Sequence, residues 1–180
     1  MVYILLGTGF EEIEALAPAD LLRRAGIDVL TVGISDKTVY GGHGIGVVAD
    51  ITIAQVDLTD LEMVVSPGGL GGVAAVRSSA QAMEILRFAW ENGKFVAAIC
   101  AGPTVLADLH ITDGRNATCY PGCEDSMGNA SVQAHAPWVR DGNLITGASA
   151  GCAIPFALAL IAALKGDAVA NTVAQQIVIR

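Results

Sequence analysis

Short apolar runs that suit buried strands alternate along this chain with longer stretches of helical periodicity. This alternation is typical of βαβ units, in which helices cover both faces of a mostly parallel sheet. We therefore expect an α/β fold, a three-layer sandwich forming one domain over residues 1–180. The expected strands are Val2–Leu6, Val29–Val32, Met63–Ser66, Val96–Ile99 and Asn143–Thr146, with a hairpin over Val39–Val48 and helices over Glu11–Ala25, Ala80–Glu91 and Cys152–Leu164.

Composition narrows the classes of partner. The chain is 53% hydrophobic and 16% charged, which suits a sheet covered on both faces, and its net charge of −8 argues against nucleic acid. The richest apolar run, Ala153–Leu164, is too short to span a bilayer. Residues 1–7 lack a basic leader, and four cysteines without a secretory signal indicate free thiols. We expect a cytoplasmic protein that binds neither nucleic acid nor membrane.

Cys100 ends an apolar strand and is followed at once by Ala101, Gly102 and Pro103. Proline fits the first turn of a helix, so Cys100 is expected at a sharp strand-to-helix turn. The free amides of a helix start favour a thiolate over a thiol. This pattern predicts a reactive cysteine nucleophile, against the alternative of a small buried residue with a structural role.

Glu14 is the candidate partner of this cysteine. Helical spacing places it at the loop end of an apolar stripe that continues through Pro18, Leu21 and Leu22. A carboxyl group in an apolar pocket tends to stay protonated and could donate a hydrogen bond to a thiolate. The alternative is that Glu14 lies at the edge of the stripe and reaches solvent.

The turn Pro67-Gly68-Gly69 follows a strand, and the carboxyl ends of parallel strands share one edge of a sheet. An amide of this turn and that of Ala101 could form an oxyanion pocket beside Cys100. The alternative is that the turn only reverses the chain and has no catalytic role. Gly71-Gly72 is expected to prolong a flexible stretch. Neither glycine pair has the spacing of a nucleotide-binding motif.

His43, His135 and Cys152 are candidate accessory residues of the site, and His110 is not. A cysteine nucleophile usually has a histidine base, and His43 in a glycine-rich hairpin or His135 in a loop could approach, although a surface role fits either. His110 lies too far along its helix to reach back. Cys152 is either a resolving thiol or a small buried residue.

Cys119 and Cys123 are four residues apart and could supply one metal-binding pair. No second pair with ligand spacing follows, and a structural zinc ion normally takes four ligands. We expect no metal and no other cofactor.

Three motifs together resemble the ThiJ/PfpI superfamily, in particular its DJ-1-like branch. They are Gly9-Phe10-Glu11-Glu12-Ile13-Glu14, the Pro67-Gly68-Gly69 turn and Ala97-Ala98-Ile99-Cys100-Ala101-Gly102-Pro103-Thr104. The resemblance implies a flavodoxin-like sandwich with a cysteine nucleophile elbow, usually homodimeric. It also implies that Cys100 is the reactive cysteine, Glu14 the protonated carboxyl group, and Gly69 and Ala101 the sources of the oxyanion-binding amides.

Members of this branch are described as cofactor-independent glyoxalases, as deglycases of methylglyoxal adducts, as oxidative-stress sensors and as chaperones. The resemblance therefore implies a cysteine-dependent enzyme acting on a small reactive aldehyde or a glycated adduct. The alternative is a redox sensor or chaperone-like protein that uses oxidation of Cys100 without significant turnover.

The chain departs from the family pattern in several places. The position of an active-site histidine in some members is expected near Ala130, and the loop over residues 149–152 reads Ser-Ala-Gly-Cys rather than a Gly-Pro-Gly-Thr type. His43 stands where an arginine is typical. Ala101 replaces the histidine that follows the cysteine in the protease-like branch, which disfavours a peptidase.

Overall fold

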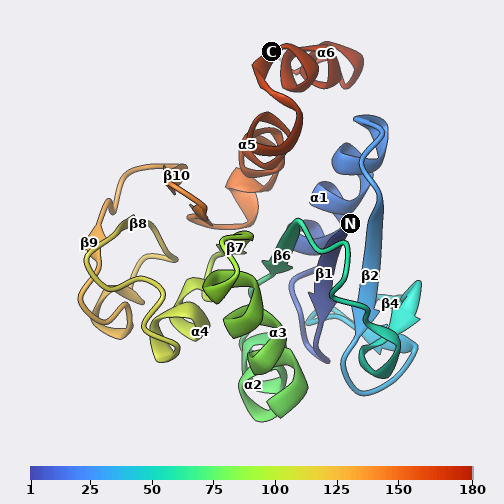
Figure 1. Ribbon diagram of the computed structural model, residues 1–180, viewed down its shortest axis with the longest axis vertical. Coiled ribbons are helices and arrows are strands. Elements are labelled where there is room, and N and C mark those ends of the chain that lie inside the picture. Colours follow the sequence, from blue (N-terminus) through green and yellow to red (C-terminus); the bar gives the residue numbers. More distant parts are fainter. Residues whose placement is uncertain (180) are drawn as a thin grey trace.

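A mostly parallel sheet lies between two layers of helices in the computed structural model, which describes residues 1–179 (Figure 1). The sheet has seven strands in the order β10-β11-β7-β6-β1-β2-β5. Every neighbouring pair is parallel except β10 and β11, which are antiparallel. The predicted α/β sandwich is therefore confirmed.

The strands of the main sheet are β1 (Val2–Leu6), β2 (Val29–Gly33), β5 (Ile51–Thr52), β6 (Met63–Ser66), β7 (Phe95–Ile99), β10 (Trp138–Asp141) and β11 (Leu144–Gly147). Two small sheets pair β3 (Thr38–Tyr40) with β4 (Gly46–Val48) and β8 (Asn116–Ala117) with β9 (Ser131–Val132). The α-helices are α1 (Glu12–Arg24), α2 (Leu70–Ser78), α3 (Ala80–Glu91), α4 (Pro103–Asp108), α5 (Ala153–Lys165) and α6 (Asp167–Gln176).

Alternation of side chains along each strand divides the core into two parts. In β1, Ile4 and Leu6 pack on the side of α1, α5 and α6, whereas Leu5 packs on the side of α2, α3 and α4. All three side chains are fully buried, because helices cover the sheet on both faces. Among the described helices, none combines the length and the apolarity needed to cross a bilayer.

One expectation from the sequence was wrong, because Gly71 and Gly72 do not extend a flexible stretch but lie inside α2. The helix predicted over Cys152–Leu164 corresponds to α5, and α6, which follows it, was not predicted. A Cβ atom on Gly72 would lie 2.6 Å from the Cα atom of Phe10. The glycines therefore allow α2 to pack closely against the β1–α1 loop, which a propensity argument does not reveal.

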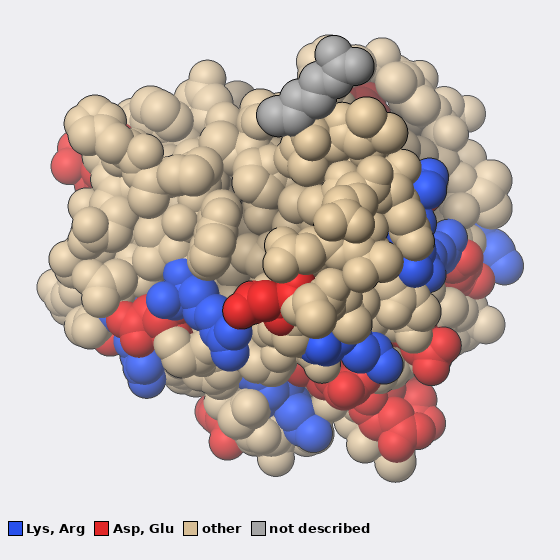
Figure 2. All heavy atoms as spheres, turned by 90° about the horizontal axis from the view of Figure 1, so that it is seen from above, with Lys and Arg blue, Asp and Glu red and all other residues tan. Residues whose placement is uncertain are grey.

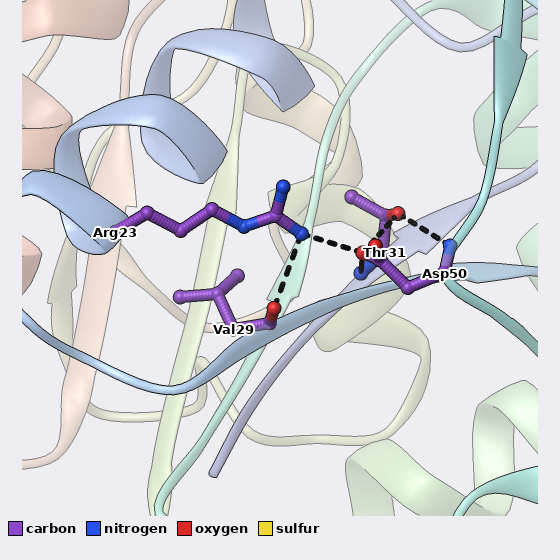
Figure 3. A network of polar contacts seen from close by, with 4 residues as sticks. All are labelled: Arg23, Val29, Thr31 and Asp50. Atoms are coloured by element: carbon purple, nitrogen blue, oxygen red, sulfur yellow. Dashed lines mark hydrogen bonds and ion pairs between the residues drawn. The ribbon is translucent and has the colours of Figure 1, made fainter.

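Asp50 joins the end of α1 to the sheet (Figure 3). Its Oδ2 atom accepts hydrogen bonds from Arg23 at 2.6 Å and from the amide and hydroxyl groups of Thr31 at 2.8 and 2.7 Å. Arg23 also donates to the carbonyl oxygen of Val29 at 3.2 Å. Burial opposes the effect, but the hydrogen bonds from Thr31 and the charge of Arg23 lower the pKa of Asp50. Asp50 is thus an ionised structural anchor.

The ends of β1, β6 and β7 lie side by side at the centre of the sheet, as the parallel pairing requires. The loops that follow Leu6, Ser66 and Ile99 therefore meet at one edge. This edge carries the candidate site.

Candidate active site

Cys100 occupies a strained turn between β7 and α4. Its backbone has φ +66°, in the left-handed region that a residue with a side chain rarely adopts. The Cys100 amide donates to the carbonyl oxygen of Gly147 at 2.9 Å, which fixes the turn to β11. A Cβ atom on Gly102 would lie 2.5 Å from the carbonyl oxygen of Ser66, so the turn also requires glycine there. The side chain of Cys100 is only partly buried.

Two main-chain amides, those of Gly69 and Ala101, lie near enough to the sulfur of Cys100 to act on its pKa. Gly69 has φ +82°, and a Cβ atom there would lie 2.6 Å from the amide nitrogen of Glu11. Only glycine fits such a position without strain. The structure therefore places the two expected amides near the sulfur, where their effect on the pKa of Cys100 is opposite to the larger effect of burial.

Glu14 lies in the core with no exposed surface, which excludes the alternative that it reaches solvent. Its Oε2 atom accepts a hydrogen bond from the Gly68 amide at 2.9 Å. Within the described residues, Oε1 is buried without a hydrogen-bond partner. Burial raises the pKa of Glu14 to about 7, although the nearby Cys100 thiol and the Gly68 amide act in the opposite direction. The carboxyl group therefore keeps its proton at pH values where an ordinary glutamate is ionised.

Glu14 and Cys100 form one coupled pair. Burial and the negative charge of Glu14 raise the pKa of Cys100 to about 12. This direction corrects the expectation of a lowered thiol pKa, which neglected the repulsion between thiolate and carboxylate. Between these two values the pair holds one proton and one negative charge. A thiolate at Cys100 thus requires that this proton resides on Glu14.

A cavity of about 270 Å³ opens beside the sulfur. Tyr120 belongs to its wall, and its amide donates to the carbonyl oxygen of Cys100 at 2.8 Å, so the loop after β8 is tied to the turn. The residues that line the cavity are Glu11, Gly69, Leu70, Cys100, Ala101, Tyr120 and Cys123. Ala130, where a histidine was expected in some relatives, is not among them.

Sequence reasoning missed both Tyr120 and Cys123 as cavity residues. The stretch over residues 114–146 shows only short strands and loops, and no periodicity indicates which of its side chains returns to β7. In this stretch β8 pairs with β9, but each strand has only two residues. Strands this short show no alternation of polar and apolar residues that the sequence could reveal.

His43 lies near the site but does not line the cavity. Its ring Nδ1 atom is 2.8 Å from Glu12 Oε2, and its amide donates to Glu12 Oε1 at 2.8 Å. The hydrogen bond with Glu12 raises the pKa of His43. Burial acts to raise the pKa of Glu12, but the hydrogen bonds from His43 outweigh it, so the pKa of Glu12 is lowered. The pair therefore links α1 to the β3–β4 hairpin beside Glu11, which does line the cavity.

The other candidate accessory residues also lie outside the cavity wall. His135 is exposed in the loop between β9 and β10. Cys152 ends a short turn of 3₁₀ helix (Ala150–Cys152), with its sulfur 3.9 Å from the hydroxyl oxygen of Ser149. His110 pairs with Asp113 at 3.0 Å.

Cys119 and Cys123 lie in the same part of the core, but the structure does not complete a metal site around them. Cys119 is 2% exposed and Cys123 is partly buried. Across residues 1–179, the one group of three or more ligating side chains whose ligand atoms lie within 4.8 Å of one another is Glu11, Glu12 and His43. Glu12 in that group is already paired with His43.

The sequence matches known proteins over almost its whole length. It is 36% identical over 178 residues to the protein dj-1beta of Drosophila melanogaster, covering 98% of this chain and 95% of that protein. It is 35% identical over 146 residues to a deglycase of Pyrococcus horikoshii, covering 81% of this chain and 87% of that protein.

Solved structures agree with these matches. Drosophila melanogaster DJ-1beta superposes with a TM-score of 0.95 over 99% of this chain and 97% of that one, at 36% identity. An oxidised DJ-1 from Toxoplasma gondii gives 0.91 over 98% and 97%, at 30% identity. The model of the DJ-1/PfpI family matches residues 1–163. The chain therefore belongs to the DJ-1/PfpI family, in its DJ-1-like branch.

Proposed function

We propose that this protein is a cysteine-dependent enzyme that acts on reactive carbonyls, as a cofactor-independent glyoxalase or deglycase of the methylglyoxal class. The substrate is a small α-oxoaldehyde or its early adduct on a thiol or amine. The name deglycase of the Pyrococcus horikoshii relative supports this class of substrate. A cytoplasmic location, where reductants keep thiols free, fits the four free cysteines.

The observation that carries the proposal is the pairing of a buried carboxyl group with a partly exposed thiol. Glu14 retains a proton to about pH 7, and its Oε1 atom has no other described partner that would stabilise an ionised form. Proton transfer from Cys100 to Glu14 gives a thiolate with two amides at its sulfur. This pair supplies both a nucleophile and a proton donor without a histidine base.

The chemistry follows from these positions. The thiolate adds to the aldehyde carbon, a C–S bond forms, and the carbonyl π electrons move to oxygen. The amides of Gly69 and Ala101 lie where they can donate to that oxygen, and Glu14 returns its proton to it. Glu14 then removes the hydrogen from the former aldehyde carbon, and an enediol forms as the neighbouring ketone oxygen takes up a proton. Return of the proton from Glu14 to the adjacent carbon, with loss of the proton on the first oxygen, gives a 2-hydroxy thioester. Hydrolysis then releases lactate and the free thiol.

The experiment is an assay of lactate release from methylglyoxal by the purified protein. Cys100→Ser and Glu14→Gln should each lose at least a hundredfold in kcat/KM, because each removes one half of the pair. Cys152→Ser is the matched control, since that thiol lies outside the cavity wall. Equal turnover in Cys100→Ser and in the parent protein would exclude the proposal.

A redox sensor without turnover is the second candidate. Cys100 is accessible from the cavity, and two amide donors at its sulfur could also hold the oxygen atoms of a sulfinate. Peptide mapping after treatment with excess peroxide should then show added oxygen at Cys100, in a protein that releases no lactate.

We also propose a homodimer built on the face formed by α1, α5 and α6. Ile13, Leu16 and Ile154 are at least 38% exposed there, beside an apolar groove of about 550 Å³. Figure 2, which views the molecule from the α5–α6 end, shows a broad tan area in which the described residues are mostly uncharged. Sedimentation analysis should give a dimer that Leu16→Glu converts to monomer, because a buried unpaired charge opposes association.

A further inference from the structure

Two thiols share the cavity beside the strained turn. Cys100 and Cys123 both belong to its wall, and both side chains are partly exposed. Cys119, in contrast, is 2% exposed, and Cys152 does not line the cavity. Of the four cysteines, Cys123 is thus the one that faces the same small volume as Cys100.

Main-chain hydrogen bonds hold the two cysteines on one connected scaffold. The Tyr120 amide donates to the carbonyl oxygen of Cys100 at 2.8 Å, which fixes the start of the loop on the turn. The Cys123 amide donates to the carbonyl oxygen of Tyr120 at 2.9 Å, which closes a tight turn and folds Cys123 back. The chain between Tyr120 and Cys123 therefore keeps the second thiol near the first.

The same loop has room to adjust. Gly122, with φ +96°, precedes Cys123, and a Cβ atom built on it would meet no described atom within 4 Å. A disulfide needs Cα atoms about 4.4–6.8 Å apart. Gly122 therefore permits, directly before Cys123, backbone angles that a residue with a side chain would resist, and this is where the main chain has to adjust for the disulfide.

We propose that Cys123 is the resolving cysteine of Cys100, so that mild oxidation by a peroxide yields an intramolecular Cys100–Cys123 disulfide. The Cys100 thiolate takes one oxygen from the peroxide, which is reduced, and becomes a sulfenic acid. The sulfur of Cys123 then attacks the sulfur of Cys100. The S–O bond breaks, the oxygen leaves as water with the thiol proton of Cys123, and an S–S bond forms.

This reaction gives the site a reversible oxidised state. Condensation with Cys123 consumes the sulfenic acid before a second peroxide can convert it to sulfinate, and a thiol reductant returns both cysteines. The inference requires a peroxide-reactive Cys100 but not carbonyl turnover, so it is independent of the proposed enzyme activity.

The test is treatment of the purified protein with an equimolar amount of hydrogen peroxide, followed by intact-mass analysis and non-reducing peptide mapping. The parent protein should lose two hydrogen atoms, remain one chain on a non-reducing gel, and yield a peptide joining Cys100 to Cys123. Dithiothreitol should restore the original mass. Cys123→Ser should instead gain oxygen at Cys100 under the same conditions.

Two control variants make the result specific. Cys119→Ser and Cys152→Ser should both form the same disulfide as the parent protein, because neither thiol faces Cys100 in the cavity. A link that joins Cys119 to Cys123, or a parent protein that accumulates sulfinate at Cys100 as readily as Cys123→Ser does, would overturn the inference. Lactate release by the unoxidised protein is measured separately and bears only on the enzyme proposal.

Discussion

The Gly68 amide donates a 2.9 Å hydrogen bond to Glu14 Oε2, so that main chain from the β6–α2 loop fixes a carboxyl group from α1 beneath Cys100. The loops after β1, β6 and β7 thus meet in one buried contact.

Glu14 makes stability depend on pH. Its pKa in the folded protein, about 7, lies above the ordinary value of 4.5. The group therefore contributes stability that is fully present below pH 4.5 and is lost as the pH rises through 7. The free energy of unfolding of Glu14→Gln, relative to that of the parent protein, should rise by up to about 3 kcal/mol between pH 5 and pH 8.5.

Urea unfolding at those two pH values measures this difference. Glu91→Gln, at an exposed position, is the matched control and should track the parent protein. Parallel stability curves for Glu14→Gln and the parent protein would show that the carboxyl group is not buried as described.

Carbonyl turnover should rise with pH through about 7. The reactive form carries one proton on the Glu14–Cys100 pair, and the fully protonated pair lacks a thiolate. Well below pH 7, kcat/KM for methylglyoxal should increase about tenfold per pH unit. A rate that is flat from pH 5 to pH 8 would contradict the coupled pair.

Gly68→Ala should disable the site by crowding. A Cβ atom on Gly68 would lie 2.6 Å from Glu14 Oε2 and 2.7 Å from the Cβ atom of Cys100. We expect at least a hundredfold loss of kcat/KM, because separation of the two groups breaks proton transfer. Gly151→Ala, whose nearest neighbour would lie at 3.9 Å, should keep full activity.

Tyr120 should affect substrate binding more than chemistry. Its side chain forms part of the cavity wall, but the hydrogen bond to Cys100 comes from its main chain. Tyr120→Ala should raise KM for methylglyoxal about tenfold, equivalent to about 1.4 kcal/mol of lost contact, with a smaller change in kcat. Tyr40→Ala, which is exposed in β3, should leave both constants unchanged.

His43 should titrate above its ordinary range because of Glu12. The ring pairs with Glu12 Oε2 at 2.8 Å, and this hydrogen bond raises the pKa of His43. The contribution of the pair is therefore lost as the pH rises through that raised pKa. Titration by NMR should place the pKa of His43 above the ordinary value of a histidine, and Glu12→Gln should bring it down. Unchanged His43 resonances in that variant would exclude the ion pair.

Much of the fold follows from periodicity. The apolar run that predicts Val2–Leu6 coincides with β1, because this strand is buried on both faces of the sheet. The pattern over Ala80–Glu91 coincides with α3, because this helix buries one recurring face. Glu14 could be placed on the buried face of α1 for the same reason. Its pairing with Cys100 follows from the shared edge of parallel strands.

Other features depend on contacts that no local pattern records. Gly71 and Gly72 have low helix propensity, yet α2 packs over them because the β1–α1 loop approaches closely. Tyr120 and Cys123 reach the cavity through an irregular loop whose path is set by hydrogen bonds to the turn. The direction of the pKa change at Cys100 depends on the burial of the thiol and on its distance from the charge of Glu14, which only the folded structure provides.

The left-handed backbone at Cys100 costs conformational energy that a glycine would avoid, but glycine lacks the thiol that the chemistry needs. Glycine adopts such angles without steric penalty, so a chain with Cys100→Gly should withstand heating better than one with Cys100→Ala. Replacement of this residue thus offers a route to a sturdier but inert scaffold, and only a requirement for the sulfur atom keeps a side chain at that position.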